Sequence, residues 1–163
     1  MAARGYVPGS LRSGGFRPVG HLVFHKSYTT RVHFLKYQHE QAYLLAKGKP
    51  PLPENPLPDV QRLFYTGNKL HPTQKAVTSL IPLVRTYSLP GELVLDPFCG
   101  SASTCAAALL TGRRYIGIEV DSEYHDNATA RMQRIHERIA AKRSSYSIPR
   151  EGDFACVPTR LKA

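Results

Sequence analysis

The order of apolar runs and helical patterns after residue 90 constrains the fold more than any other feature of the sequence. An apolar run, LVLDPF at 93–98, precedes a stretch of small residues, SASTCAAALLTG at 101–112, which is typical of a helix. A second run, RRYIGIEVD at 113–121, precedes an amphipathic helical pattern that ends near residue 141. This order predicts a βαβα unit, in which two parallel strands are joined by a right-handed crossover.

Both helices of this unit carry signals for their ends. Gly112 follows the small-residue helix and is expected to form its C-terminal cap. Asp121 or Ser122 is expected to cap the last helix at its N terminus. Apolar residues at helical spacing predict a core-facing side for that helix: Tyr124, Ala128, Met132, Ile135 and Ile139.

The residues before this unit have weaker patterns. Residues 1–15 contain Gly, Ser, Arg and Pro without periodicity and are expected to be flexible. Apolar runs at 19–24 and 41–49 predict two short strands, and the basic stretch between them is compatible with a long loop that joins an antiparallel pair. Five prolines within 48–60 predict a semi-rigid extended segment.

One more helix is predicted between the proline-rich segment and the βαβα unit. Four apolar residues are spaced for one helical face: Val77, Leu80, Ile81 and Val84. Thr73 and Thr78 are candidate N-caps. Pro82 lies inside the pattern, so the helix is expected to start late or to kink there.

Composition favours one folded domain with a polyanionic partner. The chain has 163 residues, of which 42% are hydrophobic, and the predicted domain covers 16–141, between a leader at 1–15 and a tail at 142–163. Lys and Arg number 22 against 12 acidic residues, a formal net charge of +10. This excess fits nucleic acid first and an acidic membrane surface second, while a basic protein without such a partner is an equal alternative.

The cysteines and the hydropathy of the chain indicate its surroundings. Cys99, Cys105 and Cys156 are odd in number and form no C-x-x-C pair, so neither a disulfide framework nor a metal site of the zinc-ribbon type is indicated. No apolar run approaches the roughly 20 residues that span a bilayer, and the N terminus lacks the apolar core of a signal peptide. The sequence therefore predicts a cytoplasmic protein with no metal and no membrane partner.

The carboxyl ends of the two strands offer a candidate ligand site. In open α/β sheets ligands bind beyond these ends, which places Asp96 and Gly100 at the site, with Glu119 at the end of the next strand. An acid at that position commonly accepts hydrogen bonds from ribose hydroxyls. The glycine-rich dinucleotide and phosphate-loop motifs are absent, and a carboxylate repels phosphate but attracts an ammonium group. S-adenosylmethionine therefore fits better than a dinucleotide, although a helix cap is an alternative role for Asp96 alone.

Three ordered motifs carry a resemblance to a known family: HPTQK at 71–75, DPFCGSAST at 96–104 and GIEVDSEY at 117–124. They are similar to the motifs of the β-group amino-methyltransferases of DNA, which make N6-methyladenine or N4-methylcytosine. The resemblance covers about residues 16–140. It implies a partial Rossmann-like, S-adenosylmethionine-dependent methyltransferase fold of the α/β class, with the parallel βαβα unit and an antiparallel strand pair.

The resemblance also assigns roles to single residues. It implies that Lys75 pairs with the cofactor carboxylate, that Asp96 lies near its ammonium group, and that Glu119 binds its ribose. The cofactor-binding residues that it implies are Thr73, Gln74, Lys75, Asp96, Phe98, Gly100, Ser101, Ser103, Thr104 and Glu119. The family usually has Pro at the position of Ala76 and Gly at that of Ala102, where the added methyl is expected to crowd the ligand.

No segment offers the loop with which this family presents its target base. That loop, (Asp/Asn/Ser)-Pro-Pro-aromatic, accepts the amino hydrogens of a flipped base and stacks on its ring. PPLP at 50–53 lacks both the polar residue and the aromatic, so no catalytic residue is assigned. Because the β group carries that loop before its cofactor motifs, the chain is expected to be a C-terminal portion that is inactive alone.

Two classes of function follow. The first is a site-specific DNA methyltransferase of the restriction–modification type that acts on double-stranded DNA, with adenine and cytosine both open as targets. The second is a non-catalytic remnant that binds cofactor or DNA, or one subunit that associates with itself or with a chain supplying the missing half. Methylation of RNA or protein is a weaker third hypothesis.

The basic and aromatic segment at 25–43 is the candidate DNA-binding region. It interleaves cations with aromatic rings, a combination that contacts phosphates and unstacked bases. A solvated loop is an equal interpretation. The candidate DNA-binding residues are Lys26, Arg31, Lys36 and Tyr37.

Overall fold

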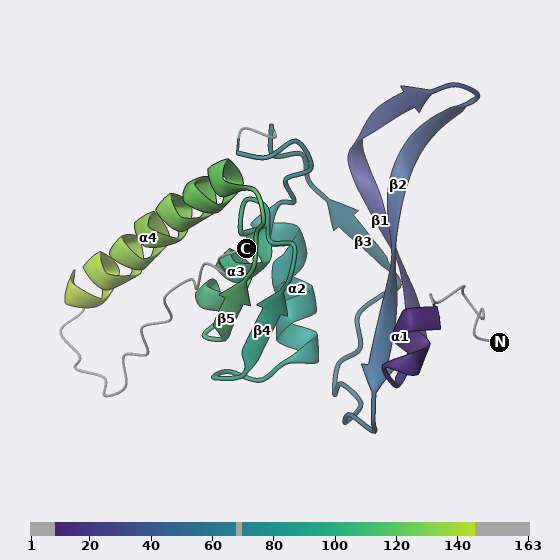
Figure 1. The fold of residues 1–163 in the computed structure, drawn as a ribbon, viewed down its shortest axis with the longest axis horizontal. Helices are drawn as coiled ribbons and strands as arrows, with labels where there is room; N and C mark the ends of the chain where they lie inside the picture. The colour runs from purple at the N-terminus through teal and green to yellow at the C-terminus, as the bar shows by residue number, and fades with distance from the viewer. Residues whose placement is uncertain (1–8, 68–69, 146–163) are drawn as a thin grey trace. The chain divides into compact units, whose positions relative to one another are not determined.

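The computed structural model describes residues 9–67 and 70–145 (Figure 1). They divide into two compact units, one ending at Tyr65 and the other beginning at Thr66. The sequence instead predicts one partial domain over 16–141. Each unit has its own sheet, so each is described by itself.

A long antiparallel hairpin forms the body of the first unit (Figure 1). β1 (Phe16–Val32) and β2 (Leu35–Lys47) pair along nearly their whole length. His33 lies in the short turn between them with φ +49°, a conformation typical of tight hairpins. The predicted antiparallel pair is therefore present, but the predicted long loop between its strands is wrong. Thr and Tyr side chains between residues 28 and 37 favour pairing, and the register of the pair shifts between His25 and Thr30.

Two short elements complete the first unit. β3 (Val60–Leu63) pairs in parallel with β1, which gives the sheet order β2-β1-β3. The sequence does not predict this strand, because four residues are too few to show a period. α1 (Gly9–Ser13) forms within the leader that is predicted to be flexible, whose residues 1–8 lie outside the described part of the chain. Residues 49–59 form neither helix nor strand, as the prolines predict.

The second unit contains the predicted βαβα arrangement. β4 (Leu93–Asp96) is followed by α3 (Ser103–Leu110), β5 (Arg114–Gly117) and α4 (Ser122–Ser145). β4 and β5 pair in parallel, as predicted. α2 (Val77–Tyr87) precedes them. α4 runs four residues beyond the predicted domain end at 141, and residues 146–163 of the predicted tail lie outside the described residues.

The core of the second unit lies between α3, α4 and β5. The alanines of α3 at 106–108 are fully buried, and such small side chains let neighbouring elements approach closely. Tyr115 of β5 and Ala128 and Met132 of α4 pack against this helix. Two residues of the predicted α4 face are thus buried and its other three are half-buried: Tyr124, Ile135 and Ile139.

Two predicted caps are present at the helix ends. Asp121 caps α4, because its Oδ1 accepts the N–H groups of Glu123 at 2.9 Å and Tyr124 at 3.1 Å. These bonds satisfy two of the donors that a helix leaves free at its N terminus. Gly112 follows Thr111, the C-cap of α3, and adopts φ +76°. That left-handed conformation is the one for which a C-terminal glycine is favoured.

The start of α2 differs from its prediction. Its N-cap is Ala76, which makes no side-chain capping bond, so the predicted caps Thr73 and Thr78 are wrong. Thr73 Oγ1 instead lies 3.0 Å from Nδ1 of His71. Pro82 lies inside the helix, which begins before the proline and not after it. The predicted apolar side of α2 packs inward only in part, with Val84 buried and the other three residues half-buried.

The strands of the second unit keep apolar side chains on an exposed face. Leu93, Leu95 and Ile116 are 48%, 57% and 40% exposed, whereas Val94 and Tyr115 alternate with them and belong to the core. Leu93, Leu95 and Ile116 are called the β4–β5 outer face below. Parallel sheets are normally covered on both faces, so this apolar face is a surface suited to a further layer of structure.

We expect Gly117→Ala to destabilise the second unit. A Cβ at this position would lie 2.8 Å from Sγ of Cys105 and 3.0 Å from Sγ of Cys99. Because the core must shift to admit it, the variant should lose about 1–3 kcal/mol. Thermal unfolding followed by circular dichroism measures the loss. Gly9→Ala is the control, since a Cβ there meets nothing within 4 Å, and equal melting temperatures for the two variants would contradict the prediction.

Candidate functional site

Hydrogen bonds to its backbone groups hold the loop between β4 and α3 in place. Asp96 Oδ1 accepts the N–H of Phe98 at 3.2 Å. The N–H of Cys99 donates to the carbonyl of Ile118 at 2.9 Å, and the N–H of Ile118 donates to the carbonyl of Asp96 at 2.9 Å. The pairing of β4 with β5 thus continues past the ends of both strands and fixes the loop at their carboxyl edge.

Glu119 joins this loop to the residues that follow β5. Its Oε2 accepts the N–H of Gly100 at 2.8 Å, and its Oε1 accepts those of Val120 at 2.9 Å and Asp121 at 3.1 Å. An ionised carboxylate has about four acceptor positions. Three are used here, so the half-buried Glu119 retains capacity for about one further hydroxyl donor.

Gly100 is a position where the loop requires glycine. It is buried and has φ +49°, and a Cβ on it would lie 3.3 Å from Cδ2 of His71. The His71 ring meets the ring of Tyr124 at a centroid distance of 4.3 Å. The close approach of these groups brings the start of α4 and the segment before α2 to the same loop. His71 is not among the predicted site residues, although it stands in the HPTQK motif.

The residues at 73–75 form hydrogen bonds within their own segment and to α3. The N–H of Thr73 donates to Nδ1 of His71 at 3.2 Å, and Oε1 of Gln74 accepts the N–H of Leu70 at 3.2 Å. The carbonyl of Lys75 accepts the hydroxyl of Ser103 at 2.7 Å. The segment therefore has a defined shape and is attached to the first turn of α3.

The hydroxyl residues after the loop differ in exposure. Ser101 and Ser103 are 3% and 6% exposed, and their Oγ atoms lie 3.3 Å apart. Thr104 is half-buried, whereas Phe98 is 88% exposed. The ten predicted cofactor-binding residues thus all lie in the second unit, but the two serines direct their hydroxyls into its interior.

The two departures from the family pattern have structural explanations. Ala102 adopts the left-handed conformation, φ +59° and ψ 35°, and belongs to the core cluster with 2% exposure. Its methyl therefore packs into the core, and this conformation costs about 1–2 kcal/mol relative to glycine. The crowding of a ligand by this methyl stays a prediction. Ala76 has φ −69°, a value that proline also adopts. Both conformations are thus ones that the usual family residue could also adopt.

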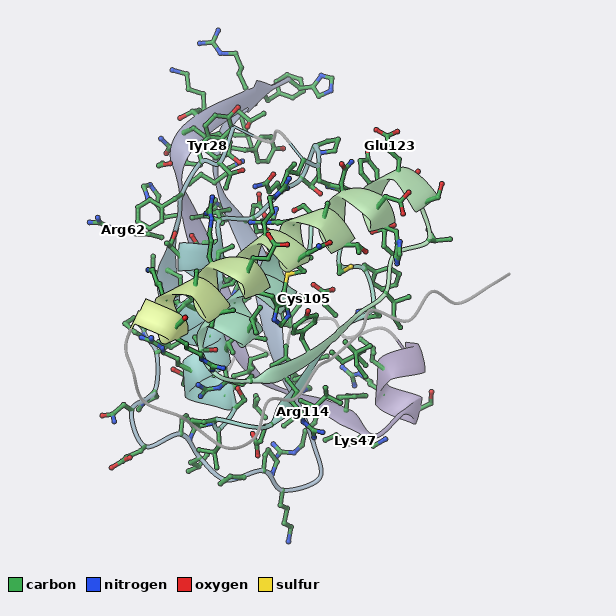
Figure 2. The ribbon with its side chains drawn as sticks, turned by 90° about the vertical axis from the view of Figure 1, so that its left-hand side faces the viewer. Tyr28, Lys47, Arg62, Cys105, Arg114 and Glu123 are labelled. Atoms are coloured by element: carbon green, nitrogen blue, oxygen red, sulfur yellow. The ribbon has the colours of Figure 1, made fainter. Side chains whose placement is uncertain are left out.

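Cys99 and Cys105 form a thiol pair beneath the loop. Both are free thiols, and Figure 2 shows Cys105 close to α4. A hydrogen bond from the Cys105 thiol lowers the pKa of Cys99, while the same bond and burial raise the pKa of Cys105. A small apolar cavity beside them is lined by both cysteines, Gly117 and Met132. Its core location and apolar lining separate it from the polar edge where Glu119 lies.

The candidate DNA-binding residues lie on the hairpin strands and not in a loop. Arg31 pairs directly with Lys36 across the strands, and Thr30 pairs with Tyr37. Arg31 and Lys36 are exposed, and opposite like charges disfavour a strand pair on their own. The Lys26 ammonium lies 5.2 Å from the centroid of the Tyr28 ring. Figure 2 shows Tyr28 on the upper part of the hairpin.

Two classes of feature are absent among the described residues. No helix in the described ranges is long and apolar enough to cross a membrane. Within those same ranges, no group of three or more His, Cys, Asp or Glu side chains could hold a metal ion. Cys156 lies outside the described residues.

The strand ends, the ordered loop and the acid on the next strand define an α/β protein with a candidate ligand site at the carboxyl edge of its parallel strands. Residues 10–130 match the model of the N6/N4 methyltransferase family, described as DNA methylase. The chain therefore belongs to the N6/N4 DNA methylase family, as the three motifs predict. The predicted partial Rossmann-like methyltransferase fold is confirmed with it.

Individual relatives agree with this assignment. The chain is 53% identical over 128 residues to "Putative methylase YubD" of Escherichia coli (strain K12), covering 78% of this chain and 56% of that protein. It is 40% identical over 93 residues to the DNA adenine methyltransferase YhdJ of the same organism, covering 52% of this chain and 32% of that protein. The crystal structure of the M1.HpyAVI–SAM complex is similar with a TM-score of 0.63 and 26% identity, covering 75% of this chain and 65% of that one. The chain thus spans less than two thirds of each of these proteins.

Proposed function

We propose that the chain is the cofactor-binding part of a DNA methyltransferase that uses S-adenosylmethionine to methylate N6 of adenine or N4 of cytosine in double-stranded DNA. The observation that carries this proposal is the convergence of the segment at 71–75, the loop after β4 and Glu119 in one hydrogen-bonded site. The family and the SAM complex of M1.HpyAVI support it. A restriction–modification role in the cytoplasm is part of the same proposal.

The chemistry of the site fits this cofactor. Glu119 has acceptor capacity for a ribose hydroxyl, and the neighbouring Val120 offers an apolar side chain that is 99% exposed. Such a side chain gains from being covered by an adenine ring. Asp96 and Lys75 supply a carboxylate for the ammonium group and an ammonium for the carboxylate of the methionine end. Bound S-adenosylmethionine supplies the methyl group for transfer.

We expect the chain to bind S-adenosylhomocysteine, the demethylated product of this cofactor, and Glu119→Ala to abolish binding. The substitution removes the proposed ribose acceptor and also frees the N–H of Gly100. Isothermal titration calorimetry measures the affinity. Glu137→Ala is the matched control, because Glu137 is an exposed residue of α4 whose side chain accepts a hydrogen bond from Gln133 of the same helix. Unchanged binding by Glu119→Ala would contradict the proposed site.

Presentation of the target base requires a part of the fold that the chain does not span. The Pro-Pro-aromatic loop is absent from the 163 residues, and the chain covers 56% of YubD. The exposed β4–β5 outer face supports the idea that a further layer packs there. We therefore propose that methyl transfer needs this further part, supplied within a longer polypeptide or by a partner.

The isolated chain is expected to transfer no label from radiolabelled S-adenosylmethionine to mixed-sequence DNA. Activity should arise when it is co-expressed with the part of YubD outside the 128 matched residues. Leu95→Glu should prevent this gain, because it places a charge on the β4–β5 outer face. Leu52→Glu, at a side chain that is 92% exposed in the proline-rich segment, is the control. Label incorporation by the chain alone would refute the requirement.

A second copy of the chain is the alternative occupant of the outer face, because exposed apolar patches also favour self-association. Light scattering separates the two cases. A dimer that Leu95→Glu dissociates would favour the second copy, and a monomer that gains activity with the YubD part would favour the heterologous layer.

The hairpin is the proposed DNA-binding element. Neutralising its three candidate cations should weaken DNA binding and reduce the slope of log affinity against log salt by about 0.9 for each phosphate that the protein no longer neutralises. Fluorescence anisotropy with duplex DNA at several salt concentrations measures both. The substitutions are Lys26→Gln, Arg31→Gln and Lys36→Gln.

The control for the hairpin variant removes the same charge elsewhere. It neutralises three exposed arginines of the second unit: Arg85, Arg134 and Arg138. If the hairpin is a specific DNA-binding site, the hairpin variant should lose more DNA affinity, and more of the salt slope, than this control variant. Equal falls for the two triple variants would mean that net charge alone attracts DNA, and the hairpin assignment would be wrong.

A further inference from the structure

Arg131 of α4 directs its guanidinium at the start of α3. Its Nη1 donates to the carbonyl of Ser101 at 2.6 Å, to Oγ of Ser101 at 3.3 Å and to Oγ of Ser103 at 3.1 Å. The side chain is half-buried, and burial lowers its pKa. A positive charge is also disfavoured at the N terminus of a helix. The stability of α3 alone therefore does not account for an arginine here.

The carbonyl that Arg131 binds belongs to the strained part of the loop. Ser101 directly precedes Ala102, whose φ of +59° is unfavourable for a residue with a Cβ. Both serines are almost fully buried. Because these contacts lie beneath the surface of the site, Arg131 acts on the shape of the loop.

A chain of hydrogen bonds leads from Arg131 to the lysine segment. Ser103 Oγ accepts from Arg131 at 3.1 Å and donates its own hydrogen to the carbonyl of Lys75 at 2.7 Å. Arg131, Ser103 and Lys75 belong to α4, to α3 and to the segment before α2. The Arg131 guanidinium is thus connected through Ser103 to the backbone of Lys75.

We propose that Arg131 is a positioning residue for the amino-acid end of the cofactor. Through Ser103 it holds Lys75, whose ammonium pairs with the methionine carboxylate, and through Ser101 it holds the adjoining turn. This inference rests on the proposed function. The ribose end depends instead on Glu119 and Gly100, which bond directly to each other.

Two ligands distinguish the amino-acid end of the cofactor site from its ribose end. S-adenosylhomocysteine has the amino-acid end, and 5′-methylthioadenosine lacks it while keeping the adenosine. We expect Arg131→Met to weaken the binding of S-adenosylhomocysteine about tenfold or more, and to weaken the binding of 5′-methylthioadenosine by less than about threefold. Arg131→Lys, which keeps the charge but not the planar fork, should recover part of the loss. Arg134→Met, at an exposed arginine of the same helix, should change neither affinity.

Titration calorimetry of the full chain measures both affinities, and thermal unfolding checks that each variant is folded. Ser103→Ala is the second variant, because it breaks the link to Lys75 and leaves the bond from Arg131 to the Ser101 carbonyl. It should show the same selective loss. If the variants bound both ligands equally more weakly, or neither more weakly, while the unmodified chain still bound S-adenosylhomocysteine, the positioning role would be wrong. Failure of the unmodified chain to bind S-adenosylhomocysteine would overturn the proposed function itself.

Discussion

The carboxylate of Glu119 is the interaction on which the site depends. It accepts backbone N–H groups from the loop after β4 and from the start of the segment that leads into α4. These N–H groups lie beyond the last bond of the β4–β5 pairing, which joins Cys99 to Ile118, so strand pairing does not satisfy them. One side chain therefore fixes two loops relative to each other and retains acceptor capacity at the edge where a ligand would lie.

Close packing of small residues makes this arrangement possible. The alanines at 106–108 bring α3 down onto the strands, and Gly117 leaves room for the sulfurs of Cys99 and Cys105. The turn at Ala102, which is buried in the same core, has a conformation that glycine would adopt without strain. The hydrogen bond from Arg131 to the Ser101 carbonyl holds the residue directly before that turn.

Much of the second unit was accessible from sequence because its signals are local. The βαβα order, the Asp121 cap and the Gly112 terminus depend on residues within a few positions of one another. The first unit was harder to predict, because its pairing depends on residues that are far apart in the sequence. The strands of its hairpin continue up to a turn of two residues. β3 pairs with β1 across a long separation in the sequence. Neither feature produces a periodic pattern within a short stretch of sequence.

The sequence by itself determined the family, the order of the motifs and the kinds of side chain at the site, because these are properties of residue type and spacing. Only the tertiary structure decided how those side chains are used. Ser103 and Lys75 are 28 positions apart and Arg131 and Ser101 are 30 apart, yet they bond directly. Hydrogen bonds at such separations arise when packed helices bring their ends together, and no local pattern encodes which buried donor will meet which acceptor.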